Sequence, residues 1–329
     1  MTQATPARPR DPAAWRAGDF RSPADWTVTL PTPVLDELAA EARRIDAASD
    51  DAIAAHAVDP ARLPAAAAAM RDLEREVMAG RGFVLVQGLD PDADDGALKA
   101  AYWVMSCLLG RPVSQNSYGE RLCDVMDLGR KIGEKRVREY QTNAHLRFHT
   151  DRCDLVGLLC VRKARSGGRS SIASAVAVFE EIARARPDLV PPLLGGVPYM
   201  NVEEGGDSGF ARYPVFAVED GIVSCRYQRN TIETAIRHGA PCTPAERAAL
   251  DAVDALAESP AFRLDMDLRR GDVQLINNYA TLHSRTGFED FPEPHLKRRM
   301  TRVWLETPTR RPVGPHFADY RGVPVTLAR

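Results

Sequence analysis

The sequence lacks any long hydrophobic run. Its longest strongly apolar stretch covers residues 155–161, whereas a membrane-spanning helix needs about 20 such residues. The first 30 residues also contain no apolar segment of the kind that forms the core of a secretory signal peptide. We therefore predict a cytoplasmic protein that does not associate with membranes.

An excess of either charge is also missing. The chain has 43 Lys and Arg against 45 Asp and Glu, which gives a formal net charge of −2, and its basic residues are spread along the whole sequence. Nucleic-acid-binding domains usually gather basic residues on one face. We therefore predict a small-molecule partner and no nucleic acid, while homo-oligomerisation is left open.

Cysteine is scarce, and its spacing carries no signature. The six cysteines are widely separated and form no Cys-x-x-Cys pair. Disulfide scaffolds and zinc sites both need closely grouped cysteines. We therefore predict free thiols in a reducing compartment.

Turn signals and apolar periodicity predict an N-terminal arm followed by one domain. Residues 1–30 are rich in Pro, Arg, Ala and Asp and are predicted to form a loosely ordered arm, with residues 31–329 forming a single domain. Helical spacing predicts helices at 33–45, 63–80, 94–109, 175–185 and 244–257. Short apolar runs predict strands at 83–86, 155–161, 214–218, 222–225, 262–268, 273–276 and 300–305. Many short strands separated by turns are typical of a sandwich or barrel.

Residues 199–240 are predicted to line or cover a binding pocket. Within them, residues 203–209 are glycine-rich but lack the context of a phosphate-binding loop. We interpret them as a mobile loop and as a candidate lid.

His149 is the only histidine followed two residues later by a carboxylate, that of Asp151. Side chains at i and i+2 of a strand project to the same face, so this pair would present an imidazole and a carboxylate together. A later histidine would complete the two-histidine, one-carboxylate set of non-haem Fe(II) oxygenases. With 7 histidines and 45 acidic residues in the chain, about one such pair arises by chance, so the motif depends on its surroundings.

The surroundings supply further elements in a fixed order. A Gly-Gly-Arg-Ser turn occupies residues 167–170, and His283 follows the predicted strand at 273–276. Arg298 comes fifteen residues after that histidine, and Arg302 comes four residues later. On a strand these two guanidinium groups would share a face and point together toward the site.

This ordered set resembles the taurine dioxygenase-like (TauD/TfdA) family of Fe(II)- and 2-oxoglutarate-dependent oxygenases. The resemblance extends over about residues 80–306. It implies a mainly β fold, a double-stranded β-helix (jelly-roll) core with flanking helices. It also implies that His149, Asp151 and His283 are the iron ligands and catalytic residues.

The resemblance also assigns the co-substrate and substrate positions. Arg298 would pair with the distal carboxylate of 2-oxoglutarate, as a planar guanidinium can do bidentately, and Ser170 stands where the family has a Thr or Ser that bonds the same carboxylate. Arg302 lies where relatives bind an anionic substrate group, and Asn143, just before the metal motif, is a further candidate for substrate contact. The 2-oxo acid and O₂ would fill the open metal positions, and oxidative decarboxylation to succinate and CO₂ would drive hydroxylation of an unactivated C–H bond.

Two departures limit what the resemblance implies. Residues 152–154 differ from those of taurine dioxygenase itself, so taurine is not implied. The spacing from His283 to Arg298 is nearer to that of the clavaminate-synthase-like branch, which hydroxylates amino acids, so a small amino-acid-like or otherwise anionic metabolite is predicted. Related halogenases have Gly or Ala in place of Asp151, which favours hydroxylation or desaturation over halogenation.

Each residue also has a plainer interpretation when taken alone. The His149–Asp151 pair could lie on the surface, and His283 could be a structural histidine. The two arginines could be outward charges on an edge strand, Ser170 a turn residue and Asn143 a polar loop residue. A catalytically silent jelly-roll binding module and a zinc hydrolase with the same three ligands are the alternative functions at this point.

Overall fold

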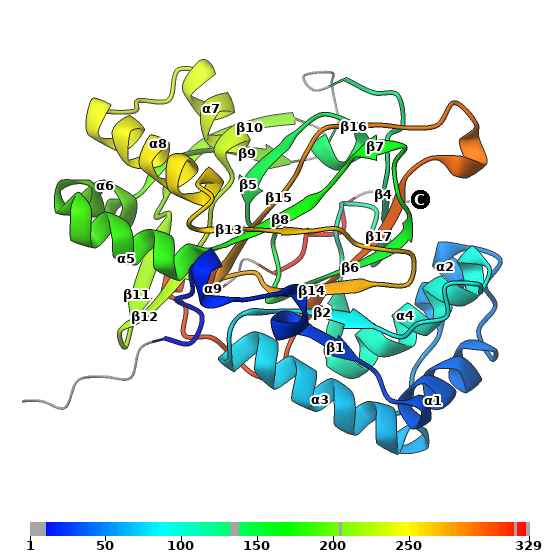
Figure 1. Cartoon of the computed structure of the whole chain (residues 1–329). Helices are drawn as coiled ribbons and strands as arrows, with labels where there is room; N and C mark the ends of the chain where they lie inside the picture. The colour runs from blue at the N-terminus through cyan, green and yellow to red at the C-terminus, as the bar shows by residue number, and fades with distance from the viewer. Residues whose placement is uncertain (1–10, 132–137, 204–205, 319–320, 327–329) are drawn as a thin grey trace, which may run out of the picture.

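Two β-sheets face each other at the centre of the molecule (Figure 1). The computed structural model describes residues 11–131, 138–203, 206–318 and 321–326. The larger sheet has the order β1-β2-β14-β6-β17-β3, with β4 also paired to β17, and the smaller has the order β13-β8-β15-β5. The strands of the larger sheet are β1 (Thr27–Thr29), β2 (Phe83–Gln87), β3 (Arg111–Val113), β4 (Leu122–Val125), β6 (Leu155–Arg162), β14 (Val273–Asn277) and β17 (Arg299–Glu306). Those of the smaller sheet are β5 (Leu146–His149), β8 (Ser170–Ser174), β13 (Arg263–Met266) and β15 (Thr281–Arg285).

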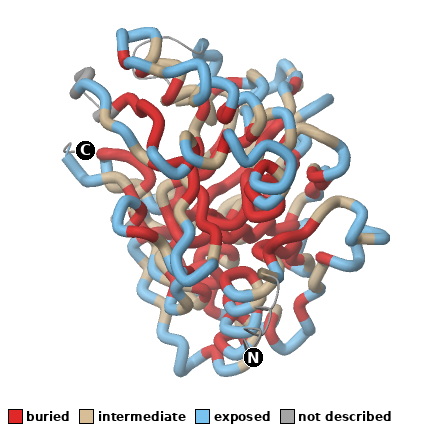
Figure 2. The backbone as a smooth tube through the Cα atoms, turned by 90° about the vertical axis from the view of Figure 1, so that its left-hand side faces the viewer, coloured by how far each residue is buried: buried red, intermediate tan, exposed pale blue. Residues whose placement is uncertain are grey.

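Successive side chains of β6 point to opposite faces of the larger sheet, and both faces are covered. Leu155, Leu159 and Val161 join the core cluster beneath the helices, whereas Val156 and Cys160 join the cluster between the two sheets. A strand buried on both faces is apolar throughout, which is why this segment is the longest apolar run of the sequence. The buried residues accordingly follow the central strands, and exposed residues occupy the outer loops (Figure 2).

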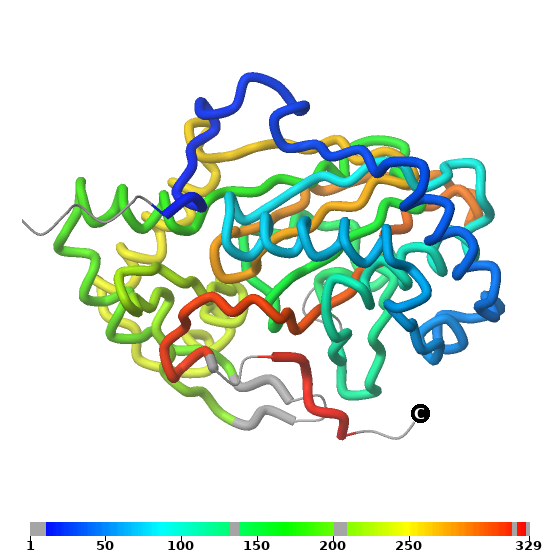
Figure 3. The backbone as a smooth tube through the Cα atoms, turned by 90° about the horizontal axis from the view of Figure 1, so that it is seen from below, coloured from blue at the N-terminus to red at the C-terminus, as the bar shows by residue number. Residues whose placement is uncertain are grey.

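The N-terminal helices cover the outer face of the larger sheet (Figures 1 and 3). They are α1 (Thr32–Ala42), α2 (Asp50–Ala55), α3 (Pro64–Ala79) and α4 (Asp95–Leu109). The helix α4 begins where Asp94 accepts a hydrogen bond of 2.9 Å from the Ala97 amide, and it ends at Gly110. Such a side-chain cap satisfies one of the amide groups that a helix start leaves free.

The remaining helices pack beside the smaller sheet and its neighbouring hairpins. These helices are α5 (Ala175–Ala185), α6 (Val190–Gly195), α7 (Arg229–Arg237) and α8 (Pro244–Glu258), with α9 (Pro315–Ala318) near the C-terminus. The hairpins are β9 (Val197–Glu203) with β10 (Gly206–Tyr213), β11 (Phe216–Glu219) with β12 (Ile222–Cys225), and the short pair β7 (Ser166–Gly167) with β16 (Phe288–Glu289). Short 3-10 helices occur at Ala17–Asp19, Pro23–Trp26, Pro60–Arg62, Glu139–Gln141, Pro187–Leu189 and Pro294–Leu296.

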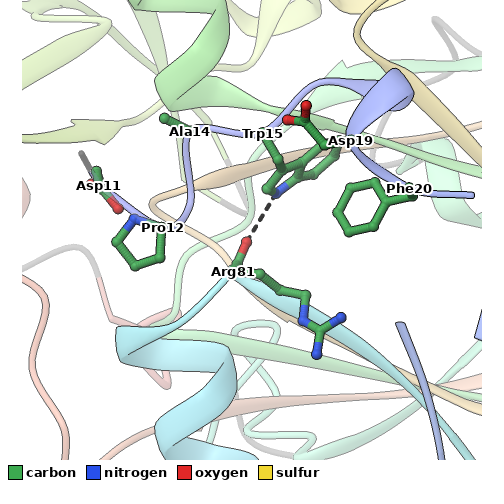
Figure 4. Close-up of a pocket in the computed structure, with 7 residues that line it drawn as sticks. All are labelled: Asp11, Pro12, Ala14, Trp15, Asp19, Phe20 and Arg81. Carbon is green, nitrogen blue, oxygen red and sulfur yellow. Dashed lines mark hydrogen bonds between the residues drawn. The ribbon is translucent and has the colours of Figure 1, made fainter. Parts of the chain in front are cut away.

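Two tryptophans of the predicted arm pack against the larger sheet. Trp15 and Trp26 are buried against Phe83 of β2, and the Trp15 indole donates a hydrogen bond of 2.9 Å to the Arg81 carbonyl (Figure 4). A surface pocket of about 390 Å³ lies between this segment and Arg81. None of the residues that line it belongs to the predicted metal site. Residues 1–10 lie outside the described part of the chain.

The glycine-rich segment at 203–209 differs from the predicted loop. Its described residues belong to strands: Glu203 is the last residue of β9, and residues 206–209 are the first of β10. Residues 204–205 lie outside the described part. The lid role of residues 199–240 stays a prediction. Among the described helices, each is too short or too polar to cross a bilayer.

Candidate metal centre

Pairing of β5 with β15 brings two histidines next to each other. His149, the last residue of β5, lies opposite His283 in the register of the two strands, and their ring centroids are 4.1 Å apart. Asp151 follows two residues later, and the ligand atoms of all three residues lie within 4.8 Å of one another. The structure therefore groups the three predicted ligands in one place.

Two details of the local structure differ from the sequence prediction. Asp151 does not share a strand with His149, because β5 ends at the histidine. A reciprocal pair of hydrogen bonds to the Asn278 side chain fixes its backbone instead: the Asp151 amide donates at 2.7 Å, and the Asn278 amide group donates to the Asp151 carbonyl at 2.8 Å. His283 follows the end of β14, as predicted, but it lies inside a further strand, β15, that was not predicted.

The His149 imidazole is held in the form that binds a metal. Its Nδ1 lies 2.8 Å from the Arg147 carbonyl, and since a carbonyl only accepts, Nδ1 donates and Nε2 keeps its lone pair. Burial, with the adjacent His283, lowers the pKa of His149 to about 3. The ring is therefore neutral at physiological pH, with Nε2 3.9 Å from an Asp151 oxygen.

The Asp151 carboxylate is held by two residues of β17. The Trp304 indole donates to Oδ2 at 2.8 Å, and the Arg302 guanidinium donates to the same oxygen at 3.1 Å. Burial alone raises the pKa of a carboxyl, but here Arg302 and the two imidazoles outweigh it and lower the pKa of Asp151. The carboxylate is therefore ionised and fixed in orientation, as a metal ligand requires.

Trp304 was not found by sequence analysis, although it lies two residues after Arg302 and so shares its face of the strand. We expect Trp304→Phe to keep the ring packing, lose the hydrogen bond to Asp151, and weaken binding of a divalent metal about 10- to 100-fold, the usual effect of removing such a partner. Anaerobic metal titration measures this change. Trp26→Phe is the matched control, since that buried indole lies outside the site. Equal metal affinity of Trp304→Phe and wild-type protein would contradict this role of the indole.

Arg298 is a buried cation that has no acidic partner among the described residues. Its side chain is 2% exposed, and within the described residues its guanidinium makes a single long hydrogen bond, of 3.4 Å, to the Val125 carbonyl. Burial lowers its pKa to about 10. A buried charge without compensation is costly, so this guanidinium is suited to an anionic ligand.

Gly168 lies directly beside Arg298, and Ser170 follows two residues later. Gly168 has a φ of +68°, and a Cβ there would come within 3.0 Å of the Arg298 Nε, so any larger residue would crowd the guanidinium. Ser170 is buried and is the first residue of β8. Its hydroxyl has no hydrogen bond among the described residues. Both features fit the carboxylate site that the family resemblance implies.

Arg302 and Asn143 lie in different settings. Arg302 is buried beside Asp151, donates through Nε to Gln115 at 2.7 Å, and stacks on Tyr140 and Trp304. Its Nη2 donates no hydrogen bond within the described residues. Asn143 is exposed in the loop before β5, where its carbonyl accepts from the Phe288 amide at 3.0 Å, so its role toward a substrate stays a prediction.

Arg285 is a further buried arginine, and sequence analysis missed it. It is 4% exposed and lies two residues after His283 on β15. Its Nη2 donates to the Thr142 and Ala144 carbonyls at 2.8 and 2.6 Å, whereas Nε and Nη1 have no partner among the described residues. Burial, together with the positive charge of Arg298, lowers its pKa to about 9. The two-residue spacing from His283 was a signal in the sequence. Only the strand register shows which residues Arg285 lies beside.

Comparisons with known proteins agree with this geometry. The sequence model of the family described as taurine catabolism dioxygenase TauD, TfdA family matches residues 44–304. FR-33289 synthase of Streptomyces rubellomurinus is 26% identical over 319 residues, which cover 94% of this chain and 93% of that protein.

Solved structures agree in fold. An asparagine oxygenase in complex with Fe(II), 2S,3S-3-hydroxyasparagine and succinate matches with a TM-score of 0.64 at 19% identity, over 86% of this chain and 94% of that one. The non-haem iron oxygenase OrfP in complex with Fe and alpha-ketoglutaric acid matches with a TM-score of 0.63 at 17% identity, over 85% and 93% of the two chains. The predicted jelly-roll core with flanking helices is thereby confirmed.

Proposed function

The chain belongs to the TauD/TfdA family of dioxygenases, and on that premise we propose that His149, Asp151 and His283 hold Fe(II) while Arg298 anchors 2-oxoglutarate. As a member of this family, the protein is a non-haem iron dioxygenase that uses 2-oxoglutarate. The observation that carries the assignment of residues is the grouping of the three ligand atoms within 4.8 Å. Two imidazoles and one carboxylate are the donor set that such enzymes use for Fe(II).

The residues of the chain prepare this site in distinct ways. Three protein ligands leave three positions of an octahedral metal open for a chelating 2-oxo acid and O₂. When bound, Fe(II) with these two co-substrates supplies the oxidant for a C–H bond and releases succinate and CO₂. His149 and Asp151 are held by hydrogen bonds before the metal binds, and Arg298 offers a guanidinium to the distal carboxylate.

We propose that the substrate is a small anionic or amino-acid-like metabolite. The support is Arg302, whose guanidinium lies 3.1 Å from the proposed ligand Asp151 and keeps Nη2 free of hydrogen bonds within the described residues. Through Nη2, the Arg302 guanidinium can bind a carboxylate or another anionic group of the substrate beside the metal. Position 151 holds an aspartate, where related halogenases have Gly or Ala. Hydroxylation is therefore the proposed outcome, with desaturation as the alternative on the same site.

The cellular setting is proposed on similar grounds. All six cysteines are free thiols in the structure, which fits a reducing compartment such as the cytoplasm. We propose a small-molecule substrate and no nucleic-acid partner, in keeping with the balanced charge.

Anaerobic addition of Fe(II) and 2-oxoglutarate tests the proposed function. We expect a weak visible charge-transfer band that requires both additions, and a screen with O₂ should show succinate formation stimulated by amino acids or anionic metabolites. Zn(II) in place of Fe(II) is the control, because it has no such band. Well-folded protein that shows neither the band nor succinate would overturn the proposal and revive the interpretation as a silent binding module.

A further inference from the structure

Arg285 and Arg298 approach the same aromatic ring. The Arg285 guanidinium carbon lies 4.8 Å from the Phe288 ring centroid, and that of Arg298 lies 5.1 Å from it. Both side chains are at least 96% buried. Two positive charges are thus enclosed in one small region, and Arg285 lies two residues after the proposed ligand His283.

The strands place Arg285 beside the other predicted co-substrate residue. In the β15–β8 register, Arg285 is the direct cross-strand partner of Ser170. Directly opposed residues of an antiparallel pair project to the same face, with Cβ atoms about 5 Å apart. Arg285 therefore lies on the face from which Ser170 and Arg298 approach the proposed carboxylate.

In the described part of the chain, the acidic residues nearby accept hydrogen bonds from groups other than the two guanidiniums. Asp290 accepts the backbone amide of Arg298 at 2.7 Å, Glu139 accepts from the Asn230 side chain, and Asp127 accepts from the Gly129 amide. Among the described residues, no carboxylate lies within ion-pair distance of either guanidinium. Because buried like charges repel, this arrangement favours binding of an anion.

We propose that Arg285 supplies a second positive charge for the distal carboxylate of 2-oxoglutarate, and so sets the preference for dicarboxylic over monocarboxylic 2-oxo acids. The inference rests on the proposed function and extends it to a residue outside the metal ligands and Arg298. Arg285 is a positioning residue in this role: its Nη2 is held by the Thr142 and Ala144 carbonyls, which fixes where its charge lies.

The test compares two 2-oxo acids that differ only in the distal carboxylate. 2-Oxoglutarate and 2-oxopentanoate are titrated into Fe(II)-loaded protein without O₂, and the charge-transfer band or the quenching of tryptophan fluorescence gives each dissociation constant. We expect Arg285→Gln to weaken 2-oxoglutarate binding roughly tenfold, the size expected of one charge a few ångströms from a carboxylate. Binding of 2-oxopentanoate should stay nearly unchanged.

Two further variants separate charge from structure. Arg285→Lys keeps the charge and should keep the preference for 2-oxoglutarate. Arg299→Gln is the matched control, since that neighbouring arginine pairs with Asp124 at 2.8 Å and should leave both dissociation constants unchanged. If Arg285→Gln fails to fold, Arg285→Lys still decides, because loss of the preference in that variant would show that the charge is not what matters.

The outcomes distinguish this inference from the proposed function. If wild-type protein binds neither 2-oxo acid, the proposed function fails. If wild-type protein prefers 2-oxoglutarate and Arg285→Gln preserves that preference, or weakens both ligands equally, Arg285 has only a structural role and the inference is wrong. A preference that falls in Arg285→Gln and is retained in Arg285→Lys supports it.

Discussion

Asp151→Ala is expected to abolish iron binding and, with it, all turnover of 2-oxoglutarate. The substitution removes the only carboxylate of the proposed ligand set and leaves the buried guanidinium of Arg302 without its partner at 3.1 Å. The site would then present an unpaired positive charge to the incoming cation. The loss of iron affinity should exceed the roughly 10- to 100-fold that follows removal of an outer partner of a metal ligand. Anaerobic Fe(II) titration and metal analysis of the purified variant measure it.

A control variant and measurements of folding show whether this loss is specific to the metal site. Asp265→Ala is the matched control, because that carboxylate lies on β13, bonds Ser171 at 2.6 Å and lies outside the proposed ligand set. Circular dichroism and the Tm establish that both variants are folded. Asp151→Ala protein that is folded and retains wild-type iron affinity would show that the carboxylate is not a ligand.

The core of the fold could be predicted because its strands are apolar on both faces. The segment at 155–161 became β6, and 273–276 became β14, since each is buried between the helices and the second sheet. The strand that carries His149 was expected and became β5, whereas β8 was missed because it begins with two serines. The composition of β8 resembles that of a loop, and its pairing with β13 and β15 makes it a strand.

The ligand set could be predicted from residue types and order, but its geometry could not. Asp151 is held by Asn278, which is 127 residues away in sequence, so the two-residue spacing alone gave the wrong local structure. Arg285 is identified from the cross-strand register, which a sequence does not state, and Trp304 from its hydrogen bond to Asp151, 153 residues away in sequence. Side-chain partners that come from distant strands are therefore the part of the site that required the structure.

Arg302, inside β17, has a carboxylate partner, whereas Arg298, just before β17, has none among the described residues, and this separates their roles. Arg302 is compensated by a carboxylate of the protein, Asp151, so it stabilises the ligand set even before a substrate arrives. Arg298 has no carboxylate partner among the described residues, and its guanidinium is buried. The positive charge that lacks a protein partner is the one suited to a co-substrate anion.

Arg298→Leu is therefore expected to raise the dissociation constant of 2-oxoglutarate on the order of 100-fold, because a charge-assisted hydrogen bond contributes about 1.5–3 kcal/mol and a guanidinium can donate two to one carboxylate. Iron binding should be unchanged, since the residue contacts none of the proposed ligands. The charge-transfer band titrated with 2-oxoglutarate measures the first quantity, and Fe(II) titration measures the second. Arg299→Gln, whose side chain pairs with Asp124, should behave as wild type in both. An unchanged requirement for 2-oxoglutarate in Arg298→Leu would assign the anchoring role to another cation, and the buried Arg285 would be the first to examine.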